Sequence, residues 1–224
     1  MESSKTPARV VGGLFIVATV ASLLSTGFIG SLLDAPDFLL RLSAYRGQVA
    51  MGALLQFVAA AGSAGIAVAL YPVLRERNEG LALGSVAFRI IEAVFYIVGA
   101  LGLLSLLSLS QQYASAGSSA TSTYEILGTW TLAARNWASF VFGVLFFCLG
   151  ASMYYSLLYQ SRLVPRWLSV WGLAGLGALF SMALLIVFGA KPAGTTLLLA
   201  LPIALQEMVL AVWLIAKGFN STAA

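Results

Sequence analysis

The chain has 224 residues, of which 60% are hydrophobic and only 9% are charged, and its formal net charge is +4. A mean hydropathy of +0.96 excludes a water-soluble domain, because such a domain needs far more charged surface. The positive charge does not indicate a nucleic-acid partner, since loop arginines that face anionic lipid headgroups account for it. We therefore expect membrane lipids to surround the protein and no nucleic acid to bind it.

Six apolar stretches are long enough to cross a bilayer, because about 20 residues that rise 1.5 Å each span roughly 30 Å of hydrocarbon. They lie at approximately 10–33, 47–74, 81–109, 128–159, 167–188 and 195–216. Loop-forming residues separate them, in DAPDF, RERNEG, SSATST, SRLVPRW and AKPAG. The sequence predicts an all-α fold, a polytopic integral membrane bundle of six transmembrane helices. Residues 1–224 are expected to form a single transmembrane domain with short cytoplasmic tails.

The start of the first apolar stretch resembles a secretory signal peptide, because Lys5 and Arg9 precede it. The stretch continues to Leu33, however, without a convincing small-residue cleavage site. We expect it to remain in the protein as the first transmembrane helix.

Basic residues are shared unequally between the two sides of the predicted bundle. Only Arg41, Arg46 and Lys191 fall on one side. Seven fall on the side that carries both chain ends: Lys5, Arg9, Arg75, Arg77, Arg162, Arg166 and Lys217. By the positive-inside rule, both termini are expected to be cytoplasmic, with the protein in the cell (plasma) membrane.

The residue inventory excludes several familiar membrane chemistries. There is no histidine, which excludes a metalloprotease-type zinc site, a histidine-ligated haem and a histidine-activated nucleophile. No aspartate lies within a predicted span, so a pair of catalytic membrane aspartates is also excluded. Cys148 is the single cysteine and has no internal disulfide partner. We expect no metal and no cofactor.

Four ionisable residues fall at membrane depth, namely Arg89, Glu92, Arg135 and Glu207. Arg89 and Glu92 are three residues apart, so they share a helix face and can pair. Counting at 1.5 Å per residue places both glutamates roughly 16 to 18 Å from the membrane surface and Arg135 about 10 Å from it. A lone charge at the helix centre costs about 2.5 to 3.5 kcal/mol on insertion scales, so we expect the four charges to pair inside the bundle.

Polar and small residues continue from these charges at helical spacing on four of the predicted helices. The stripes comprise Ser85, Arg89, Glu92, Tyr96 and Gly99; Gln48, Gly52, Gln56, Ala59 and Ser63; Arg135, Ser139, Gly143 and Gly150; and Glu207 with Ala200, Ala204 and Ala211. The first predicted helix carries a weaker polar stripe, formed by Thr19, Ser22 and Thr26. Faces of this kind pack against protein or water in preference to lipid. We predict a polar intramembrane cluster formed by Arg89, Glu92, Arg135, Glu207, Gln56 and Tyr96.

Three segments also carry a family resemblance. LYPVLRERNEGLALGSVAFRIIEAV at 70–94, SRLVPRWLSVWGL at 161–173 and PIALQEMVLAVWLIAKGF at 202–219 resemble a bacterial membrane family catalogued as domain of unknown function 4386. The resemblance implies a prokaryotic integral membrane protein with six helices. It implies no activity, ligand or catalytic residue.

Three functions remain open at this point. In the first, the polar cluster binds or transports a small solute, a proton or a lipid headgroup, with the glutamates as proton or cation acceptors and the arginines as counter-ions or anion clamps. The halves of the chain, each with a glutamate in its third helix, are also compatible with an inverted repeat of the kind found in transporters.

In the second, a glutamate acts as the general base of an intramembrane lipid or isoprenoid enzyme, which the missing His and Asp make less favourable. In the third, the buried ion pairs only hold the bundle, and a small-residue face at Ala61, Gly65 and Ala69 contacts a partner. The oligomeric state stays open, a homo-oligomer included.

Overall fold

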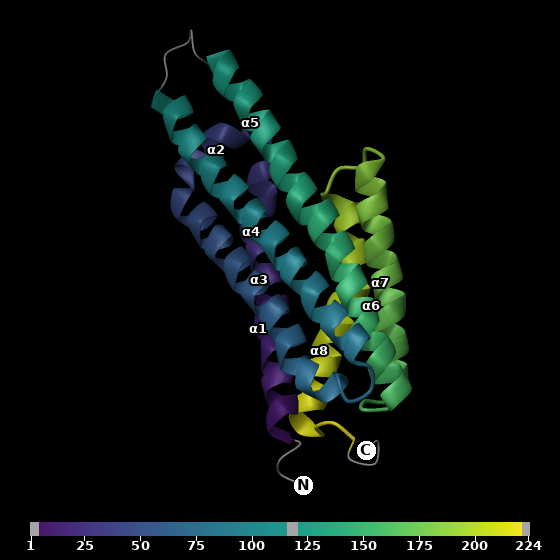
Figure 1. Cartoon of the computed structure of the whole chain (residues 1–224). Coiled ribbons are helices and arrows are strands. Elements are labelled where there is room, and N and C mark those ends of the chain that lie inside the picture. Colours follow the sequence, from purple (N-terminus) through teal and green to yellow (C-terminus); the bar gives the residue numbers. More distant parts are fainter. Residues whose placement is uncertain (1–4, 116–120, 221–224) are drawn as a thin grey trace.

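The computed structural model describes residues 5–115 and 121–220, and within these ranges it contains helices and no β-strand (Figure 1). Six helical stretches are long and apolar enough to cross a membrane. The predicted six-helix membrane bundle is therefore confirmed.

The first three passes are single helices, and the fourth and sixth are composite. The passes are α1 (Lys5–Leu33); α3 (Arg46–Leu74); α4 (Glu79–Ser115); α5 (Thr121–Asn136) with the π-helical segment η1 (Trp137–Phe142) and α6 (Gly143–Ser161); α7 (Arg166–Val187); and the 3₁₀ segment η2 (Gly194–Ala200) with α8 (Leu201–Ala216).

A short helix, α2 (Phe38–Ala44), lies in the connection between the first two passes, which we expected to be a loop. Leu39 and Leu42 of α2 are buried, and Leu42 belongs to an apolar cluster with residues of α1, α3 and α4. The connection thus forms a helix because it has an apolar side to bury.

The helices α4 and α5 extend beyond their predicted ends and form a hairpin that projects from the end of the bundle opposite the start of α1 (Figure 1). Tyr113 donates a 3.1 Å hydrogen bond to Glu125 across this hairpin. Of the predicted SSATST loop, residues 118–120 lie outside the described residues, and the remainder begins α5.

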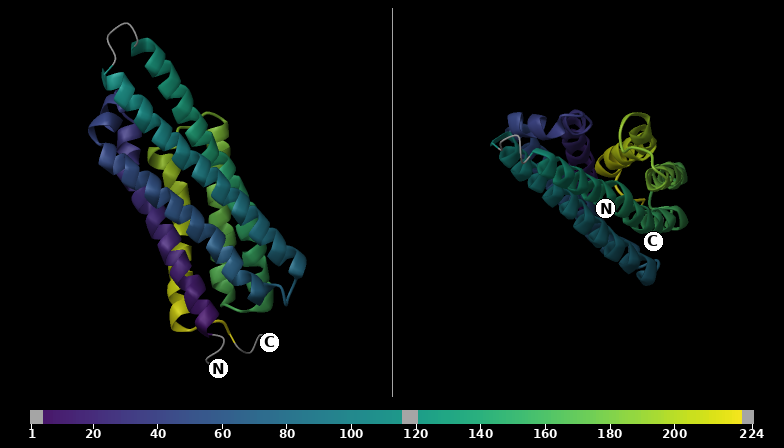
Figure 2. Two further views of the ribbon diagram at one scale, coloured as in Figure 1. Left: turned by 60° about the vertical axis from the view of Figure 1, so that its left-hand side comes forward. Right: turned by 90° about the horizontal axis from the view of Figure 1, so that it is seen from above.

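Neighbouring passes pack in a defined order, with α1 against both α3 and α8, and with α4 between α3 and α6. The view from above in Figure 2 shows α1 and α8 on the same side of the bundle. Helices from the two ends of the chain are therefore direct neighbours.

Two apolar clusters divide α1, α3 and α4 along their length. The terminal core, nearer the start of α1, includes Phe15, Ile66 and Ala82. The distal core, towards the opposite end, includes Ile29, Val49 and Leu103. On each of these three helices the polar residues of the predicted stripes lie between the two cores, except Gln48, which precedes Val49 of the distal core.

The beginning of α1 and the end of α8 lie at the same end of the molecule, as an even number of passes requires (Figure 1). Asn220 is tied to the connection between α6 and α7, because its side chain donates a 2.8 Å hydrogen bond to the Arg162 carbonyl and its backbone N–H donates a 2.9 Å bond to Leu163. The seven basic residues singled out in the sequence lie near the start of α1, the α3–α4 and α6–α7 connections and the end of α8, and therefore at this same end of the bundle.

Candidate functional site

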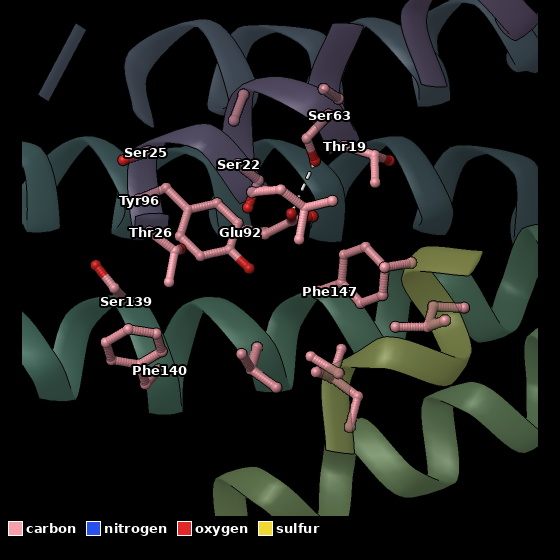
Figure 3. Close-up of a pocket in the computed structure, with 18 of the residues that line it drawn as sticks. Thr19, Ser22, Ser25, Thr26, Ser63, Glu92, Tyr96, Ser139, Phe140 and Phe147 are labelled. Carbon is pink, nitrogen blue, oxygen red and sulfur yellow. Dashed lines mark hydrogen bonds between the residues drawn. The ribbon is translucent and has the colours of Figure 1, made fainter. Parts of the chain in front are cut away.

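A cavity of about 360 Å³ lies inside the bundle, with residues from all six passes in its wall. Figure 3 shows polar side chains of α1, α3 and α4 facing this space. All six residues of the predicted polar cluster line it: Arg89, Glu92, Arg135, Glu207, Gln56 and Tyr96.

Arg89 and Glu92 form the ion pair that their spacing suggests. Arg89 Nη1 lies 3.0 Å from Glu92 Oε2, and both side chains are only 1% exposed. Ser63 of α3 donates a 2.8 Å hydrogen bond to the other carboxylate oxygen of Glu92 (Figure 3). The guanidinium also lies 4.4 Å from the centre of the Phe147 ring, close enough for a cation–π contact. The pair is thus an internally neutral unit held by three helices.

Glu207 occupies the α8 side of the cavity and is held by α1. Its Oε2 accepts a 2.8 Å hydrogen bond from the Thr19 hydroxyl. Within the described part of the chain no cation lies within 4.0 Å of this carboxylate. Glu207 therefore contributes a carboxylate with a neutral hydrogen-bond donor and no direct ion pair.

Arg135 lies at the end of α5 and is also without a direct ion pair in residues 5–115 and 121–220. It is 6% exposed, its Nη1 donates a 2.9 Å hydrogen bond to the Asn136 side chain, and its Nε has no partner among the described residues. The guanidinium lies 5.1 Å from the centre of the Phe140 ring. A buried arginine with an unused N–H donor can bind an anionic group.

This arrangement differs from the expected pairing of all four charges. Only Arg89 and Glu92 pair, while Glu207 bonds to Thr19 and Arg135 to Asn136. Counted depths put Arg135 several ångströms nearer the membrane surface than Glu207, which separates them along the membrane normal.

The π-helical segment η1 begins two residues after Arg135 and shapes the adjacent wall. The N–H of Gly143 donates to the carbonyl of Ala138, five residues earlier, so the segment accommodates one extra residue in its turn. Ser139 and Phe140, which are adjacent in sequence, both line the cavity. Segments of this kind occur frequently at functional sites.

Gln56 links three helices at this wall. Its Nε2 donates 3.0 Å hydrogen bonds to Ser139 Oγ and to the Tyr96 carbonyl. Gly99 of α4 makes the approach possible, since a Cβ there would collide with the Ser139 hydroxyl and come within 2.8 Å of Gln56 Nε2. The small residues of the predicted stripes thus create room for polar side chains.

Sequence reasoning missed a second buried polar group beside the cavity. Tyr155 donates a 2.5 Å hydrogen bond to Gln206 Oε1, and Gln206 Nε2 donates a 2.9 Å bond to the Leu168 carbonyl. Gln206 is a readable signal, because an amide within a span and next to Glu207 requires a partner. The predicted stripe residue Gln48, by contrast, bonds to the Phe28 carbonyl and does not line the cavity.

Exposed lining residues on α1 and on the η2–α8 pass indicate that the cavity opens between these two passes. The residues at this opening are largely apolar and exposed on the outside of the bundle, with Leu23 52%, Leu198 55% and Leu201 45% exposed, and Ser22 is exposed beside them. In a membrane this opening faces lipid. The site therefore combines a polar floor with an apolar mouth.

The chemistry of the wall suits hydrogen bonding and charge recognition. Carboxylate, guanidinium, amide and hydroxyl groups all face the cavity. Among the described residues there is no group of three or more His, Cys, Asp or Glu side chains that could hold a metal ion.

Comparison with known proteins gives a family without an assigned activity. A search of curated proteins and a search of solved structures returned no match. The family model described as Domain of unknown function (DUF4386) matches residues 10–218. This match covers nearly the whole chain and includes all six passes in whole or in large part, so the protein belongs to the DUF4386 family.

Proposed function

We propose that this multi-pass membrane protein binds a polar or charged group inside the cavity, and that the group belongs to a small solute or a lipid headgroup or is a transported proton. The observation that carries the proposal is the pair of opposite charges, Arg135 and Glu207, that line one cavity without direct ion-pair partners in the described residues.

Stability alone does not account for such residues. A charge at membrane depth is expensive, and even a complete buried ion pair is often no more stabilising than apolar side chains of similar volume. Within residues 5–115 and 121–220, Arg135 and Glu207 lack even the direct ion pair that offsets part of this cost. Ionisable residues that face a cavity inside a membrane protein commonly mark a solute or proton site.

We further propose that both termini face the cytoplasm and that the membrane is the plasma membrane. The support is the gathering of seven basic residues at the end of the bundle that carries the start of α1 and the end of α8. The chain is then one transmembrane domain whose polar cavity opens towards the outer leaflet.

The decisive experiment is native mass spectrometry of the protein purified in a mild detergent. Wild type is compared with Glu207→Gln and Glu92→Gln, and Glu76→Gln serves as a matched control because Glu76 is exposed in the connection between α3 and α4. We expect a species that is retained by wild type and Glu76→Gln and released by folded Glu207→Gln. The proposal would be overturned if folded wild type retained no bound species and, in liposomes, also produced no flux of protons across the membrane.

A structural role for the charges is the second candidate, and the Arg89–Glu92 pair favours it. This pair is almost completely buried and is bonded to Ser63 on a neighbouring helix, which is how a scaffold element would be built. Under this alternative Glu92→Gln lowers the melting temperature strongly and releases no ligand. Retained ligand in wild type, lost in a folded variant, excludes it as the whole explanation.

A further inference from the structure

The charges that line the cavity separate into a neutral pair and two single groups of opposite sign. Arg89 and Glu92 neutralise each other at 3.0 Å. Arg135 and Glu207 remain, and neither has a direct ion pair in the part of the chain that the structure describes. A ligand complementary to this wall carries one negative and one positive charge.

The Arg135 end of the cavity is equipped to hold an anion. The side chain is 6% exposed and lines the cavity, its Nε has no partner in the part of the chain that the structure describes, and neighbouring Ser139 lines the same wall. Ser139 Oγ accepts a hydrogen bond from Gln56 and donates none within the described residues, so its proton can be offered to a ligand oxygen. A guanidinium and a hydroxyl that lie four residues apart on one helical pass and line the same cavity provide the donors that a phosphate group needs.

The Glu207 end is equipped to hold an ammonium. Thr19 bonds to Oε2, and the other carboxylate oxygen has no hydrogen bond within the described residues. Gln56 Oε1 is another buried acceptor without a partner in the described residues, but its amide bonds to Ser139 and so belongs to the Arg135 end. Figure 3 shows Tyr96 between Ser139 and Glu92, in the middle of the polar wall.

The opening decides how such a ligand enters. Its apolar residues, Leu23, Leu198 and Leu201, are exposed where lipid surrounds the bundle. At about 360 Å³ the cavity is near the lower limit of the roughly 300 to 1,000 Å³ typical of ligand sites. The cavity is therefore large enough for a lipid head group but not for acyl chains, which must extend out through the mouth.

We infer, on the basis of the binding function proposed above, that the ligand is a membrane lipid with a zwitterionic amino-phosphate head. The phosphate contacts Arg135 and Ser139, the ammonium contacts Glu207, and the acyl chains pass between α1 and η2–α8 into the outer leaflet. Glu207 lies six residues beyond Leu201 of the mouth on the same helical pass, about 9 Å further along it at 1.5 Å per residue, so the ammonium lies deeper in the membrane than the mouth.

The test offers delipidated protein an equimolar mixture of phosphatidylethanolamine, phosphatidylglycerol and diacylglycerol with identical acyl chains and measures the bound lipid by native mass spectrometry. Wild type is expected to retain phosphatidylethanolamine about tenfold or more over each of the others. Because both phospholipids carry the phosphate that Arg135 contacts, wild type is also expected to prefer phosphatidylglycerol to diacylglycerol, and Arg135→Gln loses the preference for both phospholipids over diacylglycerol. Glu207→Gln keeps that preference and loses the preference for phosphatidylethanolamine over phosphatidylglycerol.

Substitutions at the mouth keep the inference testable if the charge variants fold poorly. Leu201→Trp narrows the mouth from a lipid-exposed position and is expected to reduce retained phosphatidylethanolamine severalfold. Leu205→Trp is the matched control, because Leu205 is 58% exposed on the same helix and does not line the cavity. Equal losses in both variants would overturn lateral entry by a lipid.

Other outcomes separate this inference from the function on which it rests. Equal retention of all three lipids by wild type overturns the zwitterionic-lipid ligand, and so does retention of soluble phosphoethanolamine in place of lipid when it is added to the same mixture. Retention of an unrelated solute that is lost in Glu207→Gln likewise overturns it and supports the proposed binding function. If wild type retains no species and produces no proton flux in liposomes, both the lipid inference and the proposed binding function are overturned.

Discussion

Thr19 and Glu207 lie 188 positions apart in the chain and are joined by a 2.8 Å hydrogen bond between α1 and α8. The bond connects the first and last passes at mid-membrane depth. It also provides the carboxylate of Glu207 with a donor that a lipid environment does not supply.

Thr19→Val should therefore destabilise the protein by about 1 to 3 kcal/mol, because it leaves a buried carboxylate oxygen without its donor. Thr19→Ser retains the hydroxyl, so its free energy of unfolding should fall much less. Thermal unfolding in detergent, followed by circular dichroism, measures the difference. Equal melting temperatures for Thr19→Val and wild type would show that the bond does not contribute.

Gly150→Ala should destabilise the protein by about 1 to 3 kcal/mol, because a core without free space resists an added methyl group. A Cβ at this position would lie 2.9 Å from Arg89 Cγ and 3.2 Å from the Arg89 backbone nitrogen. Gly177→Ala is the control, since a Cβ there meets nothing within 4 Å and alanine favours the helix. The two variants should shift the melting temperature in opposite directions, and a parallel shift would contradict the close approach of α6 to Arg89.

Glu92→Leu should cost about 3 to 5 kcal/mol, because it leaves the Arg89 charge buried without a partner. The double variant Arg89→Met with Glu92→Leu should recover most of this loss, since it removes both charges together. The measurement is the free energy of unfolding of the single and the double variant, each compared with wild type. If the double variant is as unstable as the single one, the ion pair is not the source of the effect.

Labelling of single cysteines tests the orientation. In a Cys148→Ala background, Gln112→Cys at the projecting α4–α5 hairpin should react with a membrane-impermeant maleimide in intact cells. Glu76→Cys, between α3 and α4, should react only after permeabilisation. The reverse pattern would place the termini outside the cytoplasm.

The six passes were predictable because each is a long apolar run, and lipid selects for such runs whatever the rest of the fold does. The residues of the polar cluster were also predictable as cavity neighbours, since Arg89, Glu92 and Tyr96 share one face of α4 by helical spacing alone. Spacing on one helix fixes which residues lie together on that helix and at what depth.

Contacts between helices were harder to predict. Depth counting could not show that Glu207 would meet Thr19 of α1, because it gives no information about position within the membrane plane. The short helix α2 was missed because its seven residues, Phe38–Ala44, are far too few for a span and were included in a loop. No compositional signal indicated η1, since a π-turn uses the same apolar residues as an α-helix.

The π-turn at Trp137–Phe142 makes the orientation of α5 relative to α6 depend on a single residue. Each residue of an α-helix turns the chain by about 100°. Removal of one residue from this segment, for example Val141, would permit a regular α-helix and would rotate α5 by about that angle relative to α6. Arg135 would then turn from the cavity towards the surroundings of the bundle, although the pass would remain as apolar and nearly as long as before.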